Sequence, residues 1–129
     1  MLRIVVGIFF VLHGLVHMLY FGQSQRLFEL QPGMVWPEGS WAFSNLFGAE
    51  GTRLLASIAC LLAAAGFLAG GIGIFASHAS WRPIVVVAAA FSAALFILFW
   101  DAGLQGMDNK GGVGLLINVA ILVAVLVLQ

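Results

Sequence analysis

Four long apolar runs without Asp, Glu, Lys or Arg constrain this chain more than any other feature. They cover residues 4–21, 54–76, 84–100 and 113–128. Each run is close to the roughly 20 residues that a helix needs to cross the apolar core of a bilayer. Backbone groups in that core must be hydrogen-bonded within the segment, which favours helix. The sequence therefore predicts an all-α integral membrane four-helix bundle.

Composition excludes the common soluble classes. Of the 129 residues, 63% are hydrophobic and only 8% are charged, whereas a soluble domain carries roughly a quarter of its residues as charges. This small number of charged side chains cannot cover the surface of a soluble globular protein. The sequence therefore predicts one transmembrane domain over residues 1–129. The formal net charge is zero, which provides no basic field for nucleic acid and leaves membrane lipid as the expected partner.

The connection between the first two runs, residues 22–51, is long and aromatic. Aromatic rings favour the headgroup zone of a membrane, where an apolar body and a polar edge are both accommodated. We expect an interfacial loop that lies on the membrane surface or folds over the bundle mouth, either as an anchor or as a lid. Its aromatic residues are Phe28, Trp36, Trp41, Phe43 and Phe47.

An even number of spans places both termini on one side of the membrane, together with residues 77–83. That side carries Arg3 and Arg82 and no acidic residue. Basic residues beside spanning helices favour the cytoplasm, so both termini are expected there, with an inverted topology as the alternative.

Small residues predict how the second and third helices pack. Gly66 and Gly70 have GxxxG spacing, which lets helix backbones approach closely in lipid. Packing within the bundle is the favoured interpretation, and a homo-oligomer face is the alternative. The single cysteine, Cys60, is expected to be a small core residue.

Ionisable and polar side chains inside spanning helices are the candidates for chemistry, because they are costly in lipid unless they are paired or face a cavity. His13 and His17 are four residues apart and share one helical face with Tyr20. The directions of the four helices predict that the polar groups gather at the end of the long loop. The opposite half offers little more than Ser57, Ser92 and glycines. The predicted ligand-binding residues are His13, His17, Tyr20, Trp100, Asp101 and Asn118, with His17 and Asp101 as the candidate catalytic pair.

Several kinds of site fit such a cluster. It can be a purely structural hydrogen-bonded group, or a pocket for a lipophilic small molecule in which His and Asp hold or move protons. An ion path is less favoured, because polar groups do not continue through the full thickness. No metal is predicted; His13 and His17 are weak candidates as metal ligands. Haem ligation by both is excluded, because side chains on one helical face cannot reach opposite sides of one iron.

The run His13-Gly14-Leu15-Val16-His17 before an aromatic loop, and Trp100-Asp101-Ala102 closing the third helix, resemble the DoxX-like small four-helix proteins of bacteria. The resemblance implies a multi-pass protein of the bacterial cytoplasmic membrane, in a group where some members are associated with quinone-linked or sulfur oxidation. A looser likeness to EXPERA-type bundles implies a membrane cavity with carboxylates. Only Asp101, near a helix end, matches that pattern.

These observations lead to one functional prediction and two alternatives. The chain is predicted to hold an intramembrane pocket for a lipophilic small molecule and to serve a quinone- or lipid-linked oxidoreductase system. A quinone is the candidate cofactor, and the choice between enzyme and binding protein is open. The alternatives are a non-catalytic accessory subunit of a larger membrane complex, and a small transporter or channel.

Overall fold

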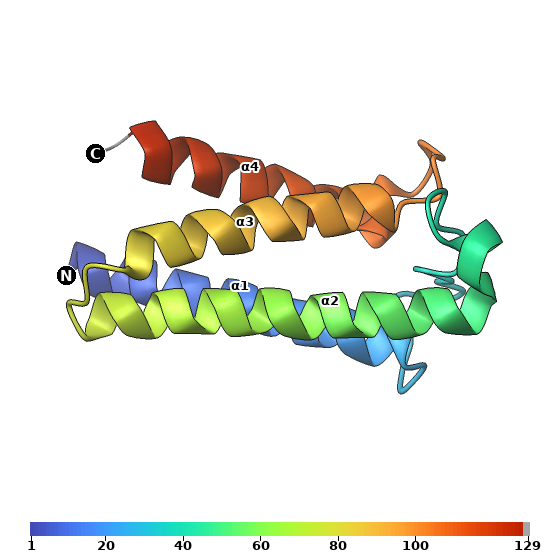
Figure 1. The fold of residues 1–129 in the computed structure, drawn as a ribbon, viewed down its shortest axis with the longest axis horizontal. Coiled ribbons are helices and arrows are strands. Elements are labelled where there is room, and N and C mark those ends of the chain that lie inside the picture. The colour runs from blue at the N-terminus through green and yellow to red at the C-terminus, as the bar shows by residue number, and fades with distance from the viewer. Residues whose placement is uncertain (128–129) are drawn as a thin grey trace.

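A computed structural model of the protein describes residues 1–127, without the side chains of residues 108 and 109. Its long helices lie lengthwise beside one another and alternate in direction (Figure 1). They are α1 (Leu2–Ser24), α2 (Ser44–Phe75), α3 (Trp81–Leu98) and α4 (Gly112–Val127), with a short 3-10 helix η1 (Met107–Lys110) before α4. The predicted all-α architecture of four helices is confirmed.

Length and composition make this bundle a membrane structure. The helices α1, α2 and α3 are each long and apolar enough to cross a bilayer, and α4 is a shorter apolar helix of 16 residues. Large apolar side chains such as Leu12, Leu62 and Leu116 point away from the bundle and are more than half exposed, as expected where lipid is the solvent. The chain is a small multi-pass membrane protein. That α4 also crosses the membrane remains a prediction.

The helix ends differ from the predicted spans where polar residues continue a helix. The second helix begins at Ser44 instead of residue 54, with a break at Gly48, whose φ of 69° is left-handed. Its first turns hold polar residues that the apolar pattern cannot include, so the predicted loop 22–51 shortens to residues 25–43. The third helix ends at Leu98, which corrects the prediction that it extends to residue 100. Residue 128, the predicted end of the last span, lies outside the described residues.

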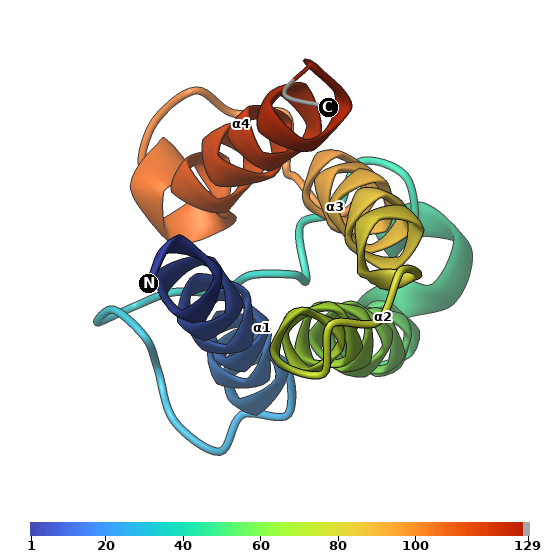
Figure 2. The same cartoon turned by 90° about the vertical axis from the view of Figure 1, so that its left-hand side faces the viewer.

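The four helices are packed in sequence order around the bundle. Within the described residues, α1 packs on α2, α2 on α3 and α3 on α4. The pair α1 and α4 shows no comparable packing, although the two helices are neighbours in the view along the bundle (Figure 2). The first and last helices therefore meet at an open seam.

Glycines on α2 permit its close approach to α3. A methyl group added at Gly66 would lie 2.8 Å from Cβ of Ala88, and one added at Gly70 would collide with the side chain of Val85. The predicted packing of these small residues within the bundle is confirmed. Cys60 is also fully buried, as predicted for a core residue.

Replacing Gly70 with leucine is expected to destabilise the protein by about 1–3 kcal/mol, because a side chain must displace α3. Unfolding in mixed detergent micelles measures the change. The matched control is Ala69→Leu, which adds the same side chain at a position of α2 that faces lipid. Equal stability of the two variants would contradict close packing at Gly70.

The loop of residues 25–43 folds over the mouth of the bundle. Trp36 is inserted among aromatic rings, with ring centroids 5.0 Å from Tyr20, 6.1 Å from Phe96 and 6.2 Å from Phe99. The Ser40 hydroxyl donates to the carbonyl of Leu98 at 2.7 Å, which ties the loop to the end of α3. Of the two predicted placements, the structure shows the loop over the mouth. Trp41 of the loop and Phe47 of the first turn of α2 nevertheless remain more than half exposed, as membrane anchors are.

Candidate functional site

Four polar side chains from three helices meet in the interior of the bundle. His13 and His17 come from α1, Ser92 from α3 and Asn118 from α4, and all four are buried. Their depths agree. Ser92 lies six residues before the end of α3 and Asn118 six residues after the start of α4, which is about 9 Å from the loop end in both helices. Side chains at one depth on antiparallel neighbours can reach one another.

These side chains form a closed set of hydrogen bonds. His13 Nε2 lies 2.9 Å from Asn118 Oδ1, and Asn118 Nδ2 lies 2.7 Å from Ser92 Oγ. Ser92 Oγ lies 2.6 Å from His17 Nε2, and His17 Nδ1 lies 2.9 Å from the His13 carbonyl oxygen. We call these four residues the polar ring. Three helices are joined through it.

The backbone carbonyl determines the direction of every bond in the polar ring. A carbonyl only accepts, so His17 Nδ1 carries the proton and donates to it. In a neutral imidazole, His17 Nε2 then accepts from the hydroxyl of Ser92. Ser92 Oγ in turn accepts from the Asn118 amide, whose oxygen accepts from His13 Nε2–H. With neutral histidines, which membrane burial favours, all four bonds are satisfied.

Aromatic side chains enclose the polar ring. Phe67 of α2 packs against both imidazoles, with ring centroids 4.6 Å from His13 and 5.4 Å from His17. Phe9 is stacked on His13 at 5.9 Å, and Phe96 lies 5.8 Å from His17. Apolar walls of this kind exclude water and strengthen the hydrogen bonds inside them.

The two histidines differ in how many of their ring nitrogens form hydrogen bonds. Both ring nitrogens of His17 are engaged. His13 Nδ1, by contrast, makes no hydrogen bond within the described part of the chain. With Nε2–H donated to Asn118, the lone pair of His13 Nδ1 can accept a hydrogen bond. A hydrogen-bond donor that reached His13 Nδ1 would therefore bind there without breaking the polar ring.

The structure divides the predicted cluster. His13, His17 and Asn118 come together as expected. Tyr20 lies beyond them along α1, with its ring 5.0 Å from Trp36 and 5.0 Å from Phe96. The ligand-binding role of all these residues remains a prediction.

Trp100 and Asp101 belong to a separate structure, the connection between α3 and α4. The indole nitrogen of Trp100 donates to the carbonyl of Gly103 at 2.8 Å. The carboxylate of Asp101 accepts from the backbone N–H of Gly103 at 2.9 Å and pairs with Lys110 at 3.0 Å. Because α3 ends at Leu98, this carboxylate lies outside the helix and its hydrogen bonds are made within the connection. No contact between Asp101 and His17 supports the predicted catalytic pair.

The hydrogen-bond and charge partners of Asp101 change the pKa of its carboxyl group. Partial burial raises its pKa, but the hydrogen bond from Gly103 and the ammonium of Lys110 outweigh this and hold the pKa below its usual value. A carboxylate with a depressed pKa contributes stability above its unfolded pKa and loses it as the pH falls through the folded one. The Asp101–Lys110 pair therefore persists at neutral pH.

The positions of Ser57 and Ser92 differ from the prediction, which placed both in the half of the bundle away from the long loop. Ser92 belongs to the polar ring, and Ser57 lies at the loop end, where it bonds to Ser24 at 3.0 Å and to Gln25 at 2.6 Å. Ser92 was not among the predicted site residues. A count of depth from the loop end, which places it level with Asn118, is the signal that identifies it.

The structure adds no observation in favour of His13 and His17 as metal ligands. Among the described residues, no three His, Cys, Asp or Glu side chains gather as a metal site. The imidazoles of His13 and His17 lie edge to face at 5.2 Å, and their Nε2 atoms are already hydrogen-bonded to Asn118 and Ser92.

The open seam between α1 and α4 contains a cleft of about 530 Å³. It extends along α1 between Leu2 and Phe10 and along α4 between Ile117 and Val125, and no residue of the polar ring lines it. Phe9 and Phe10 lie one turn from His13, and Ile117 and Ile121 flank Asn118 along α4. Its lining is almost wholly apolar and consists of Leu2, Val6, Phe9, Phe10, Trp81, Arg82, Ile117, Ala120, Ile121, Ala124 and Val125.

Comparisons with protein-family models, with curated proteins and with solved structures each found no match. The likeness to DoxX-like proteins, and the bacterial cytoplasmic membrane that it implies, therefore remain predictions.

Proposed function

We propose that the protein binds a lipophilic molecule with a hydroxyl group, of the quinol or prenyl-lipid class, in the α1–α4 cleft. The observation that carries this proposal is the cleft itself, an apolar cavity of about 530 Å³ whose lining residues Phe10 and Ile117 lie one turn from His13 and next to Asn118 in their helices. Small-molecule sites commonly have this character: they span roughly 300–1,000 Å³, with apolar walls and few polar groups.

The position of the cleft suits a ligand that is dissolved in the membrane. It follows the seam at which the first and last helices are packed less closely than the other neighbouring helices, so a hydrophobic molecule can enter sideways from lipid. Phe9 lines the cleft and is also stacked on His13. A flat ring in the cleft would therefore have an aromatic surface beside the polar contact.

His13 supplies the polar contact of this proposed site. Its Nδ1 lone pair can accept a hydrogen bond from a ligand hydroxyl. It can also take up a proton while Nε2–H remains bonded to Asn118. His17 cannot do the same, because protonation at Nε2 would remove the acceptor of the Ser92 hydroxyl. The proposal therefore assigns proton acceptance to His13 and a positioning role to His17.

This chemistry is consistent with service in a quinone- or lipid-linked oxidoreductase system. When a partner oxidoreductase takes the two electrons of a quinol, two protons are released, and a neutral imidazole one turn from the cleft residue Phe10 is a suitable acceptor for one of them. The alternative of an accessory subunit that docks through a glycine face receives less support, because Gly66 and Gly70 are directed at α3.

The experiment measures binding of a short-chain benzoquinol to the purified protein in lipid nanodiscs. Ala120→Trp fills the cleft beside the polar ring and is expected to weaken binding at least about tenfold. The control is Val123→Trp, which adds the same side chain to an exposed position of α4 outside the cleft lining. Unchanged binding in Ala120→Trp would exclude the cleft as the site.

The hydroxyl is tested with the dimethyl ether of the same quinol, which cannot donate a hydrogen bond. It is expected to bind about fivefold to tenfold more weakly, since one hydrogen bond contributes about 1 kcal/mol. Equal affinity of quinol and ether would remove the assigned contact to His13 Nδ1.

A further inference from the structure

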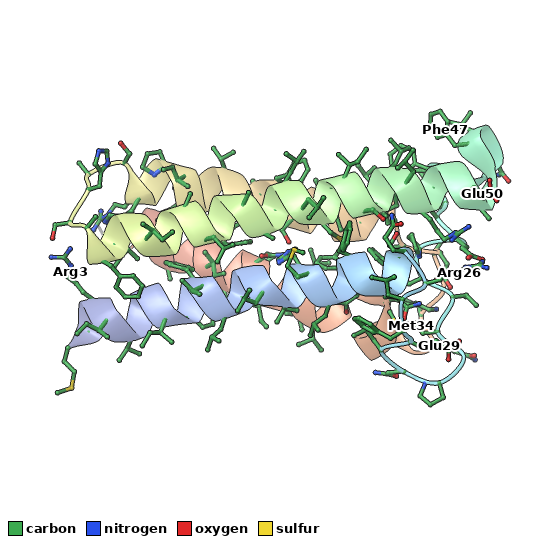
Figure 3. The ribbon with its side chains drawn as sticks, turned by 90° about the horizontal axis from the view of Figure 1, so that it is seen from below. Arg3, Arg26, Glu29, Met34, Phe47 and Glu50 are labelled. Carbon is green, nitrogen blue, oxygen red and sulfur yellow. The ribbon has the colours of Figure 1, made fainter. Side chains whose placement is uncertain are left out.

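The end of the bundle that carries the N-terminus is positively charged and has no Asp or Glu residue. Arg3 lies there at the start of α1 and Arg82 at the start of α3. Figure 3 shows Arg3 at one end, and Arg26, Glu29 and Glu50 at the other. All five acidic residues belong to the loop, to the first turns of α2 or to the α3–α4 connection.

Among the described residues, basic side chains form ion pairs at the loop end of the bundle but not at the end that carries the N-terminus. At the loop end, Arg26 and Arg53 both contact the carboxylate of Glu38, and Lys110 pairs with Asp101. In the described part of the chain, neither Arg3 nor Arg82 forms an ion pair.

The side chain of Arg3 is held in place but not neutralised. Its Nη2 donates to the carbonyl of Ile74 and to the hydroxyl of Ser77 at 2.6 Å. The other N–H groups of the guanidinium make no hydrogen bond with the described residues. Arg82 is placed over the ring of Trp81, with its guanidinium carbon 5.4 Å from the ring centroid. An anion near these groups would find positioned donors without a competing Asp or Glu side chain.

A hollow of about 430 Å³ lies beside Arg3. It has an apolar part, formed by Leu2, Val6 and Ile74, and a polar part, formed by Arg3, Ser77 and His78. Trp81, whose ring type favours the headgroup zone, lines this hollow and also the neighbouring cleft. The combination of apolar wall, indole and positive charge matches the chemistry of a phospholipid at the level of its phosphate.

We infer that this hollow binds the phosphate headgroup of an anionic phospholipid from the surrounding leaflet. Arg3 provides the principal contact, and Arg82 adds to the attraction. The lipid supplies the negative charge that the chain provides at the loop end through Glu38 and Asp101. This site goes beyond the ligand proposed for the α1–α4 cleft and does not depend on it.

The test compares lipids retained by the whole protein after reconstitution in vesicles of equal parts phosphatidylglycerol and phosphatidylcholine. Native mass spectrometry of the re-extracted protein measures the bound lipid. The wild-type protein is expected to retain phosphatidylglycerol in preference to phosphatidylcholine, and Arg3→Gln is expected to reduce that preference about fivefold. Arg3→Lys, which keeps the charge, should preserve most of it.

The matched control is Arg26→Gln, which removes an arginine from the opposite end and should leave the preference unchanged. Equal retention of the two lipids by the wild-type protein would overturn the inference even if Arg3→Gln did not fold. Equal losses in Arg3→Gln and Arg26→Gln would overturn it as well. So would thermal stabilisation by inorganic phosphate that equals the effect of phosphatidylglycerol, because the site would then recognise a free anion.

Discussion

Replacing Asn118 with leucine is expected to lower the free energy of unfolding by about 2–4 kcal/mol. The side chain is fully buried and serves two partners, since it accepts from His13 and donates to Ser92. Its loss leaves the buried His13 N–H without an acceptor, which costs about 1–3 kcal/mol. It also removes the amide that donates to Ser92 Oγ, although the Ser92 hydroxyl keeps its bond to His17. Hydrogen bonds between membrane helices are often weak, so the lower part of this range is the more natural outcome.

The measurement is unfolding in mixed detergent micelles of the wild-type protein and of three variants. These are Asn118→Leu, His13→Leu and the double variant. If the two side chains are coupled, the double variant should be at least about 1 kcal/mol more stable than the sum of the single changes predicts. Strict additivity would contradict the polar ring as a connected unit. Val119→Leu, at an exposed neighbouring position, controls for the added volume.

Replacing Trp36 with alanine is expected to be the most damaging change in the loop of residues 25–43, at about 3–5 kcal/mol. Its indole is 6% exposed and packs against Tyr20, Phe96 and Phe99. Truncation removes the side chain that fills the bundle mouth and leaves a cavity among those rings.

Trp36→Phe separates packing from hydrogen bonding. The indole nitrogen is buried and has no hydrogen-bond partner among the described residues, so phenylalanine loses volume but no bond. It should cost much less than alanine, about 1 kcal/mol or less. Val35→Ala, at an exposed position beside it, should change stability by less than about 0.5 kcal/mol. A loop that were only a surface anchor would give three small and similar effects in the same unfolding experiment.

The loss of Asn118 and the loss of Trp36 should also have different effects on ligand binding, because the two residues lie in different parts of the bundle. Loss of Asn118 removes the hydrogen-bond partner of His13, next to the cleft residue Ile117, so it is expected to weaken quinol binding. Loss of Trp36 affects the loop end, where Met34 and Phe99 pack with it. A variant at Trp36 that remains folded should therefore bind the quinol as the wild-type protein does.

Much of the candidate site was predictable from helix geometry. His13 and His17 share a face because they are four residues apart, and helix direction brings Asn118 toward them. Asp101 was predicted to close the third helix near His17 because the apolar run continues to Trp100, whereas α3 ends at Leu98. The chain turns at that point, and the Gly103 N–H and Lys110 bind the carboxylate locally. Apolar runs mark where lipid can surround a segment, but not where the backbone leaves the helix.

The loop shows a similar limit. Its aromatic residues look alike in the sequence, yet Trp36 is buried and Trp41 is exposed. The difference depends on which ring meets Tyr20 and Phe96 when the loop folds back. That contact joins segments far apart in the chain, and no local pattern encodes it.

The sequence by itself determined that this protein is made of apolar helices suited to a membrane, because charge content and run length act locally on each segment. It also determined that His13 and His17 share one face of their helix. Only the tertiary structure decided that Ser92 and Asn118 close the polar ring, that Asp101 pairs with Lys110, and that α1 and α4 leave a cleft. These features depend on the rotation of each helix about its axis and on its depth beside its neighbours, which are set by packing across the whole bundle.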